Sequence, residues 1–360
     1  MKWRDHSVFN LKLKLNIIIF DIKKLFDMTN YTVTIGQICL ANVQRDESNS
    51  TYRYGNRHKY FLELFGEFKN NSDIRPDIIS IKEVRKCKSQ GSDNLLLPND
   101  IVIDLARTGD YSIASLDSVK LHNTKNIPTY IPFFLAQLYN HHKYEKINTY
   151  CFRYYDKIFG DSSNPPHMGG SLLACLYAPR DENGCPILDK QFLIESCHFP
   201  LSSEHKMKVI KWLNEDYLIE RKRIFGDIFD KHTIIRTGDF NLFKDDLLFD
   251  QQKELLTLDY NEVTTPNLKD EFGNKMYGTF YPFPSDTPAN GVVIAKPTEN
   301  VNNTSALDYM FLSKNTQAKL LDCTLITKTF NPTNKGEKIT YDEKVVPLSD
   351  HLPLICKFSL

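Results

Sequence analysis

The sequence predicts an α/β protein in which a mixed β-sheet is layered against helices. Short apolar runs rich in β-branched residues alternate in places with amphipathic segments of helical period. Elsewhere, apolar runs follow one another with only a turn between them, which favours a sheet of mixed strand direction. Polar residues gather where the apolar runs end, so we expect functional groups at the strand ends.

Two strands and one helix are predicted in the first part of the chain. Residues 32–40 alternate between apolar and polar side chains, which is typical of a half-buried strand. Residues 56–70 place their aromatic and leucine side chains on one helical face. Residues 77–81 are again apolar and β-branched, and this second strand ends at Glu83.

Residues 84–165 carry the fewest periodic signals. They hold many Tyr, Phe and Asn residues, and one helix is predicted near residues 130–143. A structureless loop of this length is unusual in a compact domain, so we expect an elaboration with elements of its own.

The remaining chain returns to regular patterns. A turn rich in Asp, Asn, Gly and Pro separates two apolar runs, and Ser202-Ser203 then offers an N-cap for a helix. Further apolar runs predict the last three strands. In order, the elements predicted for this part of the chain are strands at residues 169–177 and 191–197, a helix at 202–222, and strands at 233–237, 308–312 and 352–358.

The composition is that of an ordinary globular protein. The 360 residues are 41% hydrophobic and 25% charged, and this length permits one large domain or two modest ones. The 45 basic and 45 acidic residues balance, which excludes a global polycation and leaves only a local basic patch for binding nucleic acid. No stretch approaches the roughly 20 apolar residues that span a bilayer. Nothing in the sequence indicates an oligomeric state.

The cysteines are typical of an intracellular protein. The chain has eight cysteines and no CxxC pair, so no zinc site is predicted from them. Four of them lie inside apolar runs, as reduced core cysteines do. These four are Cys39, Cys175, Cys197 and Cys356.

Residues 1–30 precede the pattern of the domain. They combine a short apolar core with several lysines, and no small-residue cleavage site follows, which argues against a signal peptide. The alternatives are a disordered extension and a basic amphipathic helix that touches a membrane or a partner. We expect an extension outside the domain, with Met28 as an alternative start.

The most informative motif follows the strand predicted at residues 233–237, which reads as buried. There the chain reads Gly238-Asp239-Phe240-Asn241, with a carboxylate and a carboxamide two residues apart. Side chains at this spacing in an extended segment point the same way, so Asp239 and Asn241 are predicted to face one site. A carboxylate orients water or binds a hard cation, and an amide donates to an oxyanion.

Other polar groups stand at the ends of apolar runs. Each of them alone also fits a turn or an ordinary surface position, but a sheet that brings its strand ends together would gather them into one site. These residues are Asn42, Glu83, His198, Asp308 and the pair Asp350-His351.

In this order and context, the segments resemble the endonuclease/exonuclease/phosphatase superfamily. That superfamily includes DNase I-like nucleases, apurinic endonucleases, deadenylases, tyrosyl-DNA phosphodiesterases, sphingomyelinases and inositol-polyphosphate 5-phosphatases. The resemblance implies one catalytic domain over residues 31–360, a four-layer α/β/β/α sandwich of two mixed sheets packed face to face with helices outside. It is carried by Gly238-Asp239-Phe240-Asn241 and Ser349-Asp350-His351-Leu352-Pro353, with support from Ile81-Lys82-Glu83-Val84, Cys197-His198-Phe199-Pro200-Leu201, Gly278-Thr279-Phe280 and Leu307-Asp308-Tyr309-Met310-Phe311.

The resemblance implies a divalent metal, Mg²⁺ with Mn²⁺ as an alternative. Glu83 would be the chief ligand, and Asn42 and Asp350 would contribute directly or through water. The family often has Gln where Lys82 stands, and an aromatic residue where Ala41 precedes Asn42. We expect the Lys82 side chain to alternate to the other face of the strand and leave metal binding intact.

The resemblance also implies the roles of the catalytic groups. Asp239 would orient and deprotonate the attacking water, and Asn241 would hold the phosphate or that aspartate. Asp308 would pair with His351 and favour the charged imidazole. His351 and His198 would then donate to the phosphate. The reaction expected is hydrolysis of a phosphoester by in-line attack of water.

The substrate is the least determined part of the prediction. Asp308-Tyr309 is similar to nuclease and deadenylase branches, which favours a phosphodiesterase on nucleic acid. The alternatives are a phosphatase or phosphodiesterase acting on phosphoinositides, inositol phosphates or sphingomyelin, and a non-catalytic scaffold. Aromatic and basic residues are interspersed over 128–159. They fit the core, and alternatively a surface that stacks bases.

Overall fold

The structure of this protein is a computed structural model. It describes residues 31–40, 57–84, 86–88, 95–98, 100–116, 119–120, 134–152, 158, 172–226, 232–280, 297–300, 305–327, 329–330, 346–347 and 349–360. The predicted extension at residues 1–30 and the predicted ligand Asn42 lie outside these residues.

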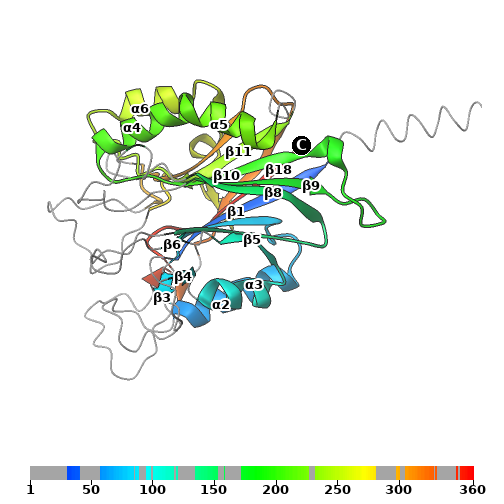
Figure 1. The fold of residues 1–360 in the computed structure, drawn as a ribbon. Coiled ribbons are helices and arrows are strands. Elements are labelled where there is room, and N and C mark those ends of the chain that lie inside the picture. Colours follow the sequence, from blue (N-terminus) through cyan, green and yellow to red (C-terminus); the bar gives the residue numbers. More distant parts are fainter. Residues whose placement is uncertain are drawn as a thin grey trace, which may run out of the picture.

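Two mixed β-sheets form the centre of the molecule (Figure 1). Most neighbouring strands are antiparallel, but β1 and β2 are parallel in one sheet, as are β13 and β15, and β10 and β11 are parallel in the other. The seven-stranded sheet has the order β13 (Lys269–Asp270), β15 (Lys319–Leu325), β18 (Leu354–Ser359), β1 (Thr32–Cys39), β2 (Ile78–Val84), β7 (Phe134–Tyr139) and β5 (Ser112–Leu116). The six-stranded sheet has the order β12 (Tyr260–Glu262), β14 (Asp308–Ser313), β11 (Thr233–Asp239), β10 (Phe192–His198), β9 (Leu172–Pro179) and β8 (Tyr144–Phe152).

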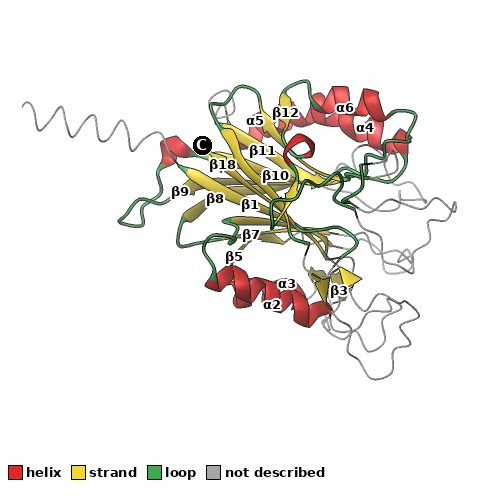
Figure 2. Ribbon diagram, turned by 180° about the vertical axis from the view of Figure 1, so that it is seen from behind, coloured by secondary structure: helices red, strands yellow, loops and turns green. Residues whose placement is uncertain are grey.

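Helices cover the outer face of each sheet (Figures 1 and 2). One layer holds α2 (Arg57–Asn70) and α3 (Asp100–Gly109), and the other holds α4 (Ser203–Asn214), α5 (Asp216–Phe225) and α6 (Phe249–Leu256). The short elements are η3 (Leu188–Lys190), η5 (Thr265–Asn267), a sheet of β3 (Lys86–Lys88), β4 (Leu95–Pro98) and β6 (Val119–Lys120), and a pair of β16 (Thr329–Phe330) and β17 (Val346–Pro347). Among the described residues, no helix is long and apolar enough to cross a membrane.

Successive side chains of each strand point to opposite faces of the sheet, and this alternation explains the layers. In β2, Ile78 packs in the core between the two sheets, whereas Ile79 and Ile81 pack against α2 and α3. In β11, Ile235 packs between the sheets, and Ile234 packs against the helices of the opposite layer. Three apolar layers therefore separate four layers of backbone, which confirms the predicted α/β/β/α sandwich.

The helix predicted near residues 130–143 is wrong. Residues 134–139 form β7, which lies between β2 and β5 and pairs with both. Leu135 faces the core between the sheets, and Ala136 and Leu138 face the helical layer, so the side chains follow a period of two. Pairing with two neighbouring strands decides the conformation of this segment over its local propensity.

The other predicted elements lie where the sequence placed them, with one division. The helix predicted over 202–222 is two helices, because the backbone leaves the helical region at Glu215 (φ −122°, ψ −87°). The described residues of the segment 84–165 form several elements. β5 and β7 join one sheet, β8 joins the other and α3 joins a helical layer, whereas β3, β4 and β6 form the small separate sheet.

Candidate active site

Three of the predicted residues form a row across neighbouring strands. His198 ends β10 and is paired in register with Asp239, which ends the parallel strand β11. Asp239 is in turn paired with Asp308, the first residue of the antiparallel strand β14. All three are buried. The strand order of the six-stranded sheet therefore gathers them at one end of its strands. This end is called here the polar edge.

Gly238 has a packing reason to precede this aspartate. A Cβ atom at Gly238 would overlap the backbone carbonyl oxygen of Cys197 on β10. Only glycine lets the two strands approach this closely. The Gly-Asp-x-Asn motif thus fixes the backbone that carries Asp239 beside His198.

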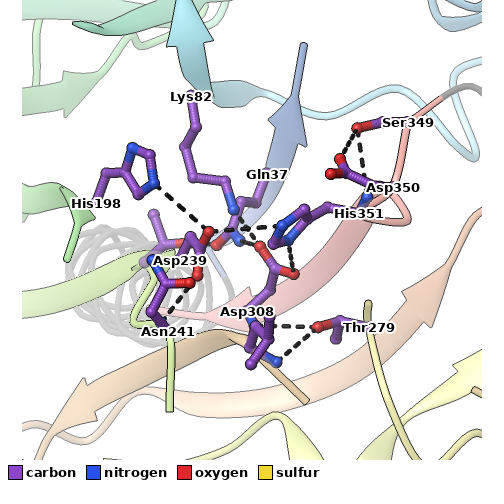
Figure 3. Close-up of polar contacts among 12 residues, drawn as sticks. Gln37, Lys82, His198, Asp239, Asn241, Thr279, Asp308, Ser349, Asp350 and His351 are labelled. Carbon is purple, nitrogen blue, oxygen red and sulfur yellow. Dashed lines mark hydrogen bonds and ion pairs between the residues drawn. The ribbon is translucent and has the colours of Figure 1, made fainter. Parts of the chain in front are cut away.

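Asp308 holds the ring of His351, the residue that opens the final strand segment (Figure 3). His351 Nδ1 lies 2.8 Å from Asp308 Oδ2, and both residues are buried. Burial alone would lower the pKa of His351, but the negative charges of Asp308 and Asp239 outweigh it and raise the pKa to about 10. The imidazole is therefore held in its charged form at neutral pH.

Asp239 lies between two histidines. Its Oδ2 atom is 3.6 Å from Nε2 of His198 and 3.6 Å from Nε2 of His351. Burial lowers the pKa of His198 to about 4, and the charge of Asp239 only partly offsets this effect. One imidazole beside Asp239 is thus neutral at neutral pH while the other is charged, although the two rings face the same carboxylate.

Asn241 differs from its predicted placement. Strand β11 ends at Asp239, and Asn241 adopts a left-handed backbone (φ 49°), so the rule for side chains two apart in an extended segment does not apply. Its backbone N–H donates to Asp239 Oδ1 (2.9 Å), and its side-chain amide donates to the carbonyl of Phe199 (2.8 Å). Asn241 therefore orients Asp239 through its main chain.

Glu83 reaches the polar edge because its strand is irregular. By alternation it would face the helical layer, as Ile79 and Ile81 do. Instead the register shifts between Ile81 and Val84, and Glu83 has a left-handed backbone (φ 54°). Such a conformation is costly for a residue other than glycine and is found at functional sites.

The carboxyl group of Glu83 lies among other charges. Burial and the neighbouring carboxylates of Asp350 and Asp239 raise the pKa of Glu83 to about 7, against the opposing charge of His351. The residues predicted from distant parts of the sequence thus share one electrostatic environment.

Lys82 corrects a second prediction. It does not turn away from the site: its ammonium group, fully buried, is hydrogen-bonded to Asp308 Oδ1. Lys82 occupies the inward-facing position of β2, and the left-handed backbone at Glu83 lets the next side chain reach the same edge. Burial alone would lower the pKa of Lys82, but the charges of Asp308 and Asp239 raise it above its usual range.

Four further residues hold the site and were not predicted as site residues, although Thr279 and Ser349 stand in the motifs that carry the resemblance. Gln37 donates to Asp308 Oδ1 (2.5 Å) and accepts from Thr237. The hydroxyl oxygen of Thr279 accepts the backbone N–H of Asp308 (3.0 Å). Ser349 donates to Asp350 Oδ1 (3.1 Å). A polar side chain in the middle of an apolar strand, as at Gln37 and Thr237, was the available signal.

The donor groups at this edge fit a divalent cation. The carboxyl groups of Glu83, Asp350 and Asp239 interact unfavourably with one another, as the raised pKa of Glu83 shows, and a cation would relieve this repulsion. Hard cations such as Mg²⁺ prefer these oxygen ligands. The thiol of Cys39 also lies within 4.8 Å of donor atoms of Asp350 and His351. The predicted ligand pair Glu83 and Asp350 is therefore well placed to hold Mg²⁺.

The aromatic stretch 128–159 contributes mostly to the interior where it is described. Tyr144 and Phe152 are buried, one between the sheets and one under the helices. Lys143 pairs with Asp77 at 2.9 Å, at the start of β2 and hence at the end of that strand remote from Glu83. Tyr144, Phe152 and Lys143 therefore serve the core and the remote end of the sheet.

Similar folds occur among solved structures. A family protein from Bacteroides thetaiotaomicron, described as endonuclease/exonuclease/phosphatase, is similar with a TM-score of 0.52 at 13% identity, covering 91% of this chain and 98% of that one. TDP2 from D. rerio, complexed with a single-stranded DNA product, gives a TM-score of 0.50 at 12% identity, covering 92% of this chain and 100% of that one. ANGEL2, described as a 2′,3′-cyclic phosphatase and bound to adenosine-2′,3′-vanadate, gives 0.51 at 14% identity, covering 92% and 96%.

By sequence, no protein-family model and no curated protein matches the chain. The structural matches each cover more than nine-tenths of both chains, so the likeness extends over the whole sandwich. They agree with the resemblance inferred from the motifs. At 12–14% sequence identity, this structural similarity establishes the architecture alone. This chain has the DNase I-like fold of the endonuclease/exonuclease/phosphatase superfamily.

Proposed function

We propose that this protein is a divalent-metal-dependent phosphoester hydrolase, and specifically a phosphodiesterase that acts on nucleic acid. The observation that carries the proposal is the convergence of Glu83, Asp239, Asp308 and His351 at one buried edge. Carboxylates and a charged imidazole are the groups that hydrolysis of a phosphoester requires. Residues that serve only folding would not need two left-handed backbones at Glu83 and Asn241.

Each residue has a task that follows from its surroundings. Asp239, oriented by the N–H of Asn241, accepts the proton of the attacking water. His351, kept charged by Asp308, donates to a phosphoryl oxygen, and neutral His198 offers a second donor. Glu83 and Asp350 would hold Mg²⁺, which when bound supplies charge relief to the phosphoryl group and the leaving oxygen.

The nucleic-acid substrate is supported by two of the structural neighbours. TDP2 is described in complex with single-stranded DNA and ANGEL2 with an adenosine derivative. A phosphomonoester is the second candidate, because another neighbour of the same fold (TM-score 0.52) is described as a mannosyl-6-phosphatase. The lipid and inositol phosphate alternatives rest on the superfamily resemblance alone.

A substrate panel with purified protein tests the proposal. We expect cleavage of single-stranded DNA or RNA, or of abasic duplex, with Mg²⁺ and none with EDTA. Asp239→Asn and His351→Gln should each lower kcat by at least about 10²–10³-fold. Asp181→Asn, at an exposed turn by the start of β10, is the matched control and should leave kcat unchanged.

Other outcomes assign the protein differently. Release of phosphate from sugar or inositol phosphates, or of phosphocholine from sphingomyelin, without cleavage of nucleic acid would replace the substrate. Turnover close to wild type in both site variants, with circular dichroism showing the same fold, would refute the catalytic assignment. Inactivity on every substrate would favour a scaffold.

A further inference from the structure

A second group of metal-ligating side chains lies at the opposite end of the strands from the polar edge. Asp110 precedes β5, and His141 and His142 lie in the turn between β7 and β8. The pairing of Ser112 with Tyr139 in β5 and β7 brings these two connections together. Tyr139 is also paired with Ile78 at the start of β2, whereas Glu83 lies at the end of that strand. The group is therefore separate from the proposed catalytic residues.

The geometry of this group suits one ion. Each of Asp110, His141 and His142 offers a donor atom, and the three atoms lie within 4.8 Å of one another. Nε2 of His142 is 3.3 Å from Asp110 Oδ2, and the two imidazole rings have centroids 4.0 Å apart. An ion bound to nitrogen and oxygen ligands at about 2.0–2.2 Å needs only small side-chain movements from this arrangement.

The backbone around the group is fixed in place. Asp110 has a left-handed conformation (φ 59°), and its carbonyl accepts a hydrogen bond from Arg75 (2.8 Å). The N–H of His142 donates to Asn140 Oδ1 (3.1 Å), and the N–H of Asn140 donates to the carbonyl of Asp77 (2.8 Å). The ligands are thus presented by short connections anchored to the ends of the sheet, which limits the entropy lost on binding.

The state of the imidazoles also favours a metal. Nδ1 of His141 is shielded from solvent and has no hydrogen-bond partner among the described residues, an uncommon state for a buried polar atom. This nitrogen is therefore available to ligate an ion.

Two nearby guanidinium groups, those of Arg75 and Arg180, oppose a cation here. The guanidinium of Arg75 lies 4.0 Å from Asp110 Oδ2. It is engaged with the carbonyl of Asp110 and stacks over the ring of Tyr111 at 4.9 Å, so it does not occupy the space between the three donors. Arg75 instead holds Asp110 in place, as outer hydrogen-bonding groups do around metal ligands.

We propose that Asp110, His141 and His142 bind a divalent transition-metal ion of the zinc type. Two imidazoles and one carboxylate match the ligand set of zinc, and a water would complete the coordination because His142 is exposed and the other two residues are partly exposed. Mg²⁺ avoids nitrogen ligands, so the two ends of the molecule would select different metals. A bound ion would tie the α3–β5 connection to the β7–β8 turn.

Equilibrium dialysis against Zn²⁺, followed by quantification of bound metal, tests the site in the full chain. Four proteins are compared: wild type, His141→Ala/His142→Ala, Glu83→Gln, and His205→Ala as a control histidine on α4. We expect the double variant to bind one equivalent less Zn²⁺ than wild type, and to lose the rise in unfolding temperature that Zn²⁺ produces. Glu83→Gln and His205→Ala should keep this equivalent of bound Zn²⁺ and the rise in unfolding temperature.

The outcomes separate this site from the proposed function. Equal Zn²⁺ binding by wild type and the double variant would overturn the site, and so would loss of all Zn²⁺ binding in Glu83→Gln. Any hydrolysis with Mg²⁺ should proceed at the same rate in the double variant and in wild type. The zinc site and the catalytic proposal can therefore fail independently of each other. A Co²⁺-loaded Glu83→Gln protein should show absorption bands without the thiolate charge-transfer band that ligation by Cys39 would produce.

Discussion

Lys82 is a buried cation of the polar edge, beside the charged ring of His351. Its ammonium group bonds Asp308, whose other oxygen orients His351, so the lysine acts on the imidazole through the aspartate. Removing one partner of a buried ion pair typically costs about 3–5 kcal/mol. We expect Lys82→Met to lower the free energy of unfolding by this amount and to reduce kcat strongly.

Lys82→Gln is the matched variant, because it keeps a hydrogen-bond donor for Asp308 without the charge. It should retain more stability and more turnover than Lys82→Met. Urea unfolding and kcat measured on the same preparations check both variants. Equal behaviour of the two would show that the charge of Lys82, and not its hydrogen bond, is what matters.

The raised pKa of Glu83 predicts how the Mg²⁺ concentration required for activity depends on pH. Burial and the charges of Asp350 and Asp239 raise the pKa of Glu83 to about 7, so below that pH a proton must leave before the carboxylate can bind a cation. The Mg²⁺ concentration that gives half-maximal activity should therefore rise by about tenfold per pH unit below pH 7 and level off above it. A requirement for Mg²⁺ that is constant between about pH 5 and 7 would contradict this assignment.

At the same scale, the sequence predicted which residues end strands but not which line the space between sheets. His198, Asp239 and Asp308 stand at the ends of apolar runs, and pairing in register brings them together. Gln37 and Thr237 lie within strands, and a period of two does not reveal which face meets the second sheet. Their role depends on the sheet-to-sheet packing, which no local pattern encodes.

At the scale of single elements, β10 and β11 approach so closely at Gly238 that no side chain fits there. Gly238→Ala would place a methyl group on the carbonyl of Cys197, and overpacking of this kind costs about 1–3 kcal/mol or more. We expect a lower urea midpoint and loss of activity, since Asp239 would be displaced.

Gly66→Ala in α2 is the control for that substitution. The nearest atom to a Cβ there is Thr108 Cγ2 at 4.0 Å, an ordinary contact. Alanine in a helix interior is favoured over glycine by up to about 1 kcal/mol, so this variant should be slightly more stable than wild type. Similar midpoints for the two alanine variants would refute the packing role of Gly238.

Elements with a clear apolar period were predictable, and those defined by their neighbours were not. β1, β2, β10, β11, β14 and β18 all match apolar runs in the sequence. β7 was predicted as a helix because its strand character comes from pairing with β2 and β5. The division between α4 and α5 at Glu215 carries neither Gly nor Pro, so the sequence shows no break there.

At the scale of the whole molecule, a buried ion network joins the six-stranded sheet to its helices. Glu195 of β10 accepts from Arg236 of β11 (2.8 Å) and from Arg221 of α5 (3.1 Å). Burial alone would raise the pKa of Glu195, but the two guanidinium groups outweigh it and lower the pKa below its ordinary value of 4.5. The charged carboxylate therefore stabilises the fold above about pH 4.5, and this contribution is lost as the pH falls further.

Glu195→Gln tests this network. At pH 7 the variant should lose about 3–5 kcal/mol in the free energy of unfolding, because the buried guanidinium of Arg236 and the partly buried one of Arg221 would lack their counter-charge. Below about pH 4.5 wild type should weaken more steeply than the variant, and urea unfolding across pH measures both curves. Parallel curves for the two proteins would show that Glu195 contributes nothing to the acid sensitivity.

The position of β18 in its sheet has a consequence for synthesis on the ribosome. β18 lies between β15 and β1, although β1 comes near the beginning of the sequence and β18 follows His351. A nascent chain that has not reached Leu354 holds β1 and β15 without the strand that joins them. Its exposed strand edges would be open to premature association until β18 is available to pair with both strands.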